Sequence, residues 1–102
     1  MAQFDVYKNV RGGKFSLLLD VQTDLLARLA TRVVVPMATV KQYGATPISR
    51  LNPIFKIQGA RYVLVFQELA AIEANGLGEQ VGTLAAHRAE LVAALDLLLT
   101  GI

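Results

Sequence analysis

The feature that most constrains the fold is an alternation of apolar and polar side chains near the start of the chain. In QFDVYK (residues 3–8), Phe4 and Val6 would share one side of an extended backbone. KFSLLLDV (residues 14–21) repeats this period of two, with apolar residues at Phe15, Leu17, Leu19 and Val21. Gly12 and Gly13 lie between the two stretches and tolerate the positive φ of a turn. The pattern predicts a β-hairpin.

Three further strands are expected in the middle of the chain. TRVVVPMA (residues 31–38) contains Pro36, which has no N–H to donate, so we expect this proline at a sheet edge or a strand end. NPIFKIQ (52–58) and RYVLVFQ (61–67) flank Gly59-Ala60, a plausible two-residue turn. These two stretches predict a second hairpin. RYVLVFQ is apolar on both faces, which is typical of a central strand.

The last third of the chain favours helix. Intrinsic propensity makes ELAAIEANG (68–76) helical, although glycines crowd the stretch that follows. LAAHRAELVAALDLLL (84–99) has leucines at helical spacing after Thr83, a candidate N-cap, and Gly101 is a candidate stop signal. The spaced leucines are Leu84, Leu91, Leu95 and Leu98. The predicted fold class is α+β, a strand-rich body closed by one C-terminal helix.

Composition suggests a protein that associates with itself. A chain of 102 residues suits one domain, and 54% hydrophobic residues with 18% charged residues is more apolar than one small core requires. We therefore expect a homodimer. The absence of cysteine and of a signal peptide fits the cytoplasm, and LVAALDLLLTGI carries Asp96 and is too short to span a membrane.

Charge is distributed unevenly along the chain. Residues 1–61 hold nine basic and three acidic side chains, whereas residues 62–102 hold one basic and five acidic side chains. This asymmetry could mark a surface for a polyanion or an acidic partner. The alternative is that basic loops are scattered over a sheet.

The residues that could carry chemistry do not form an enzyme-like set. His87, the only histidine, is expected on the solvated face of its helix. Asp20 and Asp24 are too few for a calcium site; we expect Asp20 to end a strand and Asp24 to cap a turn. GGK and GLGEQVG lack the spacing of nucleotide-binding loops and are interpreted as turns. The sequence therefore favours binding over catalysis, with no cofactor and no metal.

Several segments together resemble the CcdB family of toxins from toxin–antitoxin operons. They are QFDVYKN, FSLLLDVQTDLL, TRVVVPMA, LNPIFKIQG and the final GI, and the resemblance runs from Gln3 to Ile102. It implies a small SH3-like β-barrel or antiparallel sheet with a C-terminal α-helix, in one domain over residues 1–102 that forms a homodimer. It also implies that AAIEANG (70–76) is a short strand and loop.

The resemblance further implies a function and its residues. Family members bind the A subunit of DNA gyrase and trap the gyrase–DNA cleavage complex. They are neutralised by a CcdA-like antitoxin with a disordered tail, and they reach operator DNA only within the antitoxin complex. The family's gyrase contacts correspond here to Leu99, Thr100, Gly101, Ile102, Leu25 and Leu26. The apolar ending LLLTGI is then a binding surface; the alternative is that it seals the barrel.

Thr100 departs from the family pattern, because the best-known members carry Trp there. If that Trp contributes ~2–3 kcal/mol, its absence weakens binding roughly 30–150-fold unless other contacts compensate. Two alternatives stay open. One is an inactive paralogue that only binds antitoxin, and the other is a MazF/Kid-type endoribonuclease on the same fold. The ribonuclease would use a basic groove, for which the candidates are Arg28, Arg32, Arg50 and Arg61.

Overall fold

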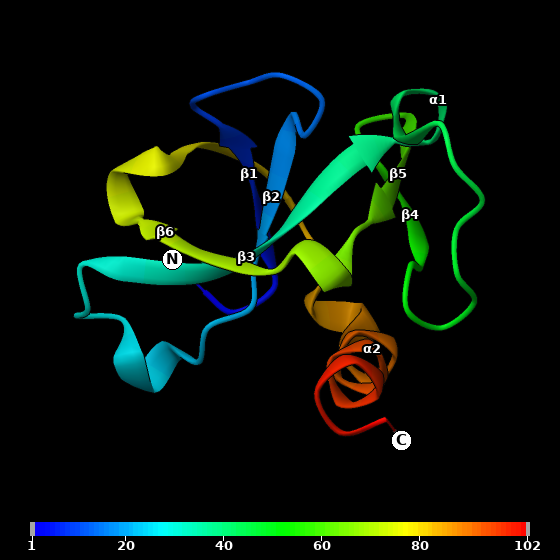
Figure 1. Cartoon of the computed structure of the whole chain (residues 1–102). Coiled ribbons are helices and arrows are strands. Elements are labelled where there is room, and N and C mark those ends of the chain that lie inside the picture. Colours follow the sequence, from blue (N-terminus) through cyan, green and yellow to red (C-terminus); the bar gives the residue numbers. More distant parts are fainter. Residues whose placement is uncertain (1, 102) are drawn as a thin grey trace.

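The computed structural model describes residues 2–101 and confirms an α+β fold (Figure 1). The described chain forms one antiparallel sheet, two α-helices and four 3₁₀ turns. The strands are β1 (Asp5–Asn9), β2 (Leu17–Asp20), β3 (Thr31–Thr39), β4 (Ile54–Ile57), β5 (Ala60–Leu64), β6 (Ala70–Glu73) and β7 (Leu77–Thr83). The helices are α1 (Val40–Tyr43) and α2 (Arg88–Thr100), and the 3₁₀ turns are η1 (Asp24–Leu26), η2 (Phe66–Glu68), η3 (Ala74–Gly76) and η4 (Ala85–His87).

The sheet curls into a half-barrel around its longest strand, β3. The strand order is β4-β5-β3-β2-β1-β7, and β6 pairs with the first half of β3 while β5 pairs with the second half. Figure 1 shows β3 crossing the molecule and α2 lying against one side of the curled sheet. Within residues 2–101, no helix is long and apolar enough to cross a membrane.

Both predicted hairpins form. In the first, Val6 pairs with Leu19 and Tyr7 with Leu18. In the second, Ile57 pairs with Ala60. The loop of the second hairpin is Gln58-Gly59, with φ of 49° and 85°, as in a type I′ turn, so the predicted turn at Gly59-Ala60 was one residue too late. Strand β5 lies between β4 and β3, which confirms its central position.

Pro36 does not lie at a sheet edge or a strand end, as its missing N–H donor predicted. It sits in the interior of β3, opposite Leu18 of β2. On the other side of β3, pairing with β6 stops at Val34 and pairing with β5 starts at Met37, so Pro36 falls in the gap between two partner strands. Its carbonyl still accepts a hydrogen bond from the Val65 N–H at 3.0 Å. The missing donor is tolerated because the ladder is interrupted there.

The helix predicted by propensity at ELAAIEANG is wrong. The chain forms β6, η3 and then β7, in agreement with the short strand and loop implied by the family resemblance. Gly78 allows β7 to approach β1 closely, because a Cβ at this position would lie 3.0 Å from the Lys8 carbonyl oxygen. Sheet pairing thus overrides the local preference for helix.

The core lies between α2 and one face of the sheet. The buried apolar cluster includes Val6, Leu19, Val35, Met37, Phe66, Leu91 and Ala94. Leu95 and Leu98 pack against it while partly exposed, so the predicted apolar face of the helix is confirmed. Thr83 Oγ1 accepts a hydrogen bond from the Ala85 N–H at 3.3 Å, and α2 itself begins after η4. Gly101, with φ of 78°, ends the helix as expected.

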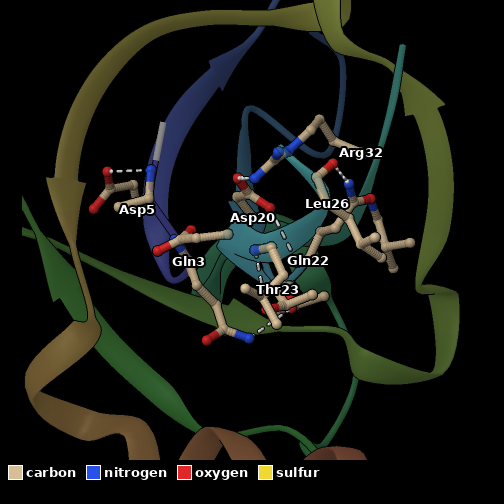
Figure 2. A network of polar contacts seen from close by, with 12 residues as sticks. Gln3, Asp5, Asp20, Gln22, Thr23, Leu26 and Arg32 are labelled. Atoms are coloured by element: carbon tan, nitrogen blue, oxygen red, sulfur yellow. Dashed lines mark hydrogen bonds and ion pairs between the residues drawn. The ribbon is translucent and has the colours of Figure 1, made fainter. Parts of the chain in front are cut away.

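The opposite face of the sheet buries a charged pair. Asp20 and Arg32 have side chains 0% and 1% exposed, and an Arg32 Nη2 hydrogen donates to Asp20 Oδ2 (Figure 2). Asp20 ends β2, as predicted. Arg32 was expected to be available to a basic groove; that expectation is wrong, because its charge is enclosed and paired.

Tyr7 belongs to the same face, since its register partner is Leu18 and side chains alternate along a strand. Its hydroxyl has no hydrogen-bond partner among residues 2–101. Burial, together with the Asp5 and Asp20 carboxylates, raises the pKa of the Tyr7 phenol. The phenol therefore stays neutral at physiological pH.

Gly78→Ala should destabilise the fold by about 1–3 kcal/mol, because the new methyl group meets a backbone oxygen that cannot move without disturbing β1. Gly82→Ala is the matched control. A Cβ at Gly82 would lie 3.4 Å from the flexible Ile57 Cδ1, so we expect little change. Urea unfolding of both variants provides the comparison, and equal effects would contradict the close-approach explanation.

Arg32→Ala should cost about 3–5 kcal/mol, because it leaves the Asp20 carboxylate buried without its cation. Arg61→Ala, at an exposed position, should stay within about 0.5 kcal/mol of the parent protein. Thermal melting and urea unfolding measure both. A mild effect of Arg32→Ala would mean that water reaches the pair.

Candidate functional site

The last turn of α2 exposes one large apolar side chain. Leu99 is 71% exposed, beyond the part of the helix that packs on the core. Thr100 Oγ1 donates to the Asp96 carbonyl oxygen at 2.7 Å, so this hydroxyl bonds to its own helix. The Gly101 N–H donates to the Leu97 carbonyl oxygen at 3.1 Å. Ile102, also predicted as a contact, lies outside the described residues.

A second apolar surface lies on the connection between β2 and β3. Leu25 is 91% exposed and Leu26 is 47% exposed, both within η1. Leu29, 51% exposed, extends the same surface and was missed by sequence reasoning. Its signal was present in TDLLARL, where three leucines follow a capping Thr-Asp pair. We call residues 24–29 the leucine segment.

Local hydrogen bonds explain why the leucine segment turns as it does. Thr23 Oγ1 accepts from the Leu25 N–H at 3.3 Å, so Thr23 is the cap that was predicted at Asp24. The Leu29 N–H donates to the Leu26 carbonyl oxygen at 3.1 Å. None of the three residues of η1 is buried. Packing against the core therefore does not hold this turn.

Polar contacts from the body of the protein hold the segment instead (Figure 2). Gln22 Nε2 donates to the Leu26 carbonyl oxygen at 2.9 Å, and Gln22 Oε1 accepts from the Val33 N–H at 3.0 Å. The Gln22 N–H donates to Asp20 Oδ1 at 3.0 Å. The buried ion pair, the start of β3 and the leucine segment thus form one network.

Gln3 connects this network to α2. Its N–H donates to Asp24 Oδ1 at 2.7 Å, and its Nε2 donates to the Val21 carbonyl oxygen at 3.1 Å. Its Oε1 accepts from Arg88 Nη1 at 3.0 Å, and the Arg88 guanidinium lies 5.7 Å from the centre of the Phe4 ring. The leucine segment and the first turn of α2 are therefore tied to the same N-terminal residue.

The two apolar surfaces remain separate within one protomer. Figure 1 shows η1, in cyan, well apart from the red end of α2. Leu25 and Leu26 therefore do not join Leu99, Thr100 and Gly101 in a single site on one chain.

The remaining candidates for chemistry are dispersed. His87 is half exposed, as expected of a solvated residue, but its ring also lies against Phe55 with centroids 4.6 Å apart. A hollow of about 650 Å³ beside β6 and η3 is lined by Arg11 and Glu73 among other residues, and neither Asp20 nor Arg32 lines it. Residues 2–101 contain no cluster of three side chains able to hold a metal ion.

Comparison with known families identifies the chain. A family model described as CcdB protein matches residues 3–101. The matched range includes the curled sheet, α2 and both apolar surfaces, and it confirms the resemblance carried by the sequence segments. This chain therefore belongs to the CcdB family, the toxins of toxin–antitoxin systems.

Proposed function

We propose that this protein is a toxin that binds the A subunit of DNA gyrase and traps the gyrase–DNA cleavage complex. The observation that supports this most is the exposure of Leu99 and of the leucine segment in a chain of the CcdB family. Fully burying one Leu side chain stabilises a complex by roughly 1.5–3 kcal/mol. Exposed leucines of this kind therefore favour a protein-binding surface.

The proposed mechanism uses binding energy and no bond chemistry. A ligand shifts a conformational equilibrium only by the difference between its affinities for the two states. To trap gyrase, the toxin must bind the enzyme with cleaved DNA more tightly than the resealed state. A hundredfold preference corresponds to about 2.7 kcal/mol, which is within reach of one or two buried leucines.

A homodimer would supply both apolar surfaces to one partner. The surfaces lie apart on one protomer, so pairing two copies is a simple way to bring the leucine segment of one near the helix end of the other. The high hydrophobic fraction of 54% supports self-association. We expect the protein to act in the cytoplasm, where gyrase acts on DNA.

Leu99 is the proposed anchor at the helix end. The Thr100 hydroxyl is already bonded to the Asp96 carbonyl oxygen, so Thr100 offers its partner little beyond a methyl group. Trp at this position in better-known members buries much more apolar surface. Leu99 and the leucine segment must then contribute most of the affinity.

The second proposed partner is a CcdA-like antitoxin with an acidic, disordered tail, and operator DNA is reached only through that complex. Exposed basic residues lie on the loop after β1 and on the short helix α1. Lys14 Nζ is 5.6 Å from the centre of the Tyr43 ring, which brings the loop after β1 close to α1 and Lys41. These charges suit an acidic chain.

Leu99→Ala and Leu25→Ala should each lower affinity for gyrase A about tenfold or more, with folding unchanged, because both side chains are exposed before binding. Ile48→Ala is the control, as an exposed apolar residue on another loop. Thr100→Trp should tighten binding. Calorimetry gives the affinities, and light scattering gives the oligomeric state. Linear DNA that appears after treatment with denaturant and protease reports the trapped complex.

Three outcomes would contradict this proposal: no linear DNA with the parent protein, cleavage of RNA by the purified protein, or a loss of folding or dimerisation in Leu99→Ala. The first favours an antitoxin-binding paralogue. The second favours a ribonuclease. The third would mean that the helix end is structural.

Affinity for the tail of the cognate antitoxin should fall as salt rises, because part of the attraction is Coulombic and is screened. Titration of the synthetic tail at low and at moderate ionic strength measures this. Lys14→Ala should flatten the salt dependence. An affinity indifferent to salt would remove the electrostatic part of the proposal.

A further inference from the structure

One buried side-chain amide attaches the middle of the leucine segment to the sheet. Gln22 is 7% exposed, whereas all three residues of η1 lie outside the core. Local backbone hydrogen bonds run from the Leu26 N–H to the carbonyl of Thr23, the residue before the segment, from Ala27 to Asp24 and from Leu29 to Leu26. These bonds shape the turn but do not attach it to the sheet.

Gln22 makes that attachment with both ends of its amide. Its carbonyl oxygen accepts from the Val33 N–H on β3, and its NH₂ group donates to the Leu26 carbonyl oxygen at 2.9 Å. A glutamine offers an acceptor and a donor on one planar group, which no aliphatic side chain and no ionised acidic side chain of this size does. The amide therefore bridges a rigid strand and an exposed turn.

The bridge itself is well anchored. The Gln22 N–H donates to Asp20 Oδ1 at 3.0 Å, and the other oxygen of Asp20 is paired with buried Arg32. The segment has a second attachment at its start, where Asp24 Oδ1 accepts from the Gln3 N–H. Gln22 is the contact that reaches the carbonyl of an exposed leucine.

We infer that Gln22 is a positioning residue of the partner-binding surface, holding Leu25 and Leu26 in place before a partner arrives. The inference rests on the proposed function, since it assigns Gln22 a role in that binding. Without the bridge, the turn samples other conformations and must be ordered on binding, which lowers affinity. Loss of hydrogen bonds of this kind corresponds to about a three- to tenfold weaker complex.

The test combines hydrogen exchange with binding. In Gln22→Ala, the amides of Leu26, Ala27 and Leu29 should exchange at least about tenfold faster, while those of α2 keep their protection. When its carboxyl group is ionised, Gln22→Glu retains an acceptor for Val33 but loses the donor to Leu26. At a pH high enough to ionise it, the segment should loosen while the Val33 amide stays protected.

Gln67→Ala is the matched control. Gln67 also donates through its side-chain amide, to Asn52 Oδ1 at 3.4 Å, but it belongs to η2, and within residues 2–101 no hydrogen bond joins its amide to the leucine segment or to residues 99–101. Its loss should leave exchange in residues 24–29 and affinity for gyrase A unchanged.

A double-mutant cycle separates positioning from a general loss of stability. Gln22→Ala should weaken gyrase A binding about three- to tenfold in the parent protein, but less than about twofold when Leu25 and Leu26 are both Ala. An equal loss in both backgrounds, or unchanged exchange in residues 24–29, overturns the inference.

Failure of the proposed function gives a different result. If the parent protein does not bind gyrase A, the proposed function is wrong, and exchange in Gln22→Ala and Gln22→Glu alone decides whether Gln22 holds the segment. If Gln22→Ala does not fold, Gln22→Glu replaces it in both the hydrogen-exchange and the binding measurements.

Discussion

The rest of the structure depends on a carboxylate and a guanidinium buried together, Asp20 at the end of β2 and Arg32 near the start of β3. Each would be costly to bury alone, so the two strands must meet in one register. Asp20 also accepts the Gln22 N–H, and Gln22 reaches the carbonyl of Leu26. An interaction inside the half-barrel is therefore coupled, through two side chains, to the shape of an exposed apolar turn.

The two apolar surfaces are built in different ways. Leu99 follows a helix whose preceding residues pack on the core, so its position is set by the helix. The leucine segment has no buried residue within η1 and is positioned by hydrogen bonds. Membership of the CcdB family gives these surfaces a common context, that of a toxin from a toxin–antitoxin system. The proposed action on gyrase would be favoured by surfaces that are ordered before they bind, because less conformational entropy is then lost.

Sequence reasoning succeeded where local pattern and tertiary structure agree. Alternation predicted the first hairpin, and two strand-like stretches flanking a glycine turn predicted the second. Leucine spacing with Gly101 predicted α2 and its end. Sequence reasoning failed where a contact distant in sequence determines the local structure. Strand β7 forms because Gly78 can approach Lys8 closely, and Pro36 is tolerated inside β3 because it lies between two partner strands. Arg32 looked like a surface charge, because nothing nearby in sequence shows that Asp20 would enclose it. The exposed leucines 25, 26 and 99 were assigned from family resemblance, whereas Leu29 and the bridging role of Gln22 emerged only from the geometry.

Thr100 and Gly101 end α2 in a way that separates two requirements, packing of the core and contact with a partner. A binding protein must usually satisfy both with the same residues. Among residues 2–101, Leu98 is the last side chain of the helix that packs on the core, and the Thr100 hydroxyl bonds to its own helix. Residues 99 and 100 can therefore change from one relative to another without repacking the interior. If the helix end is the proposed gyrase contact, such a terminus would let a lineage exchange one target for another, or lose its target, while the scaffold is inherited intact.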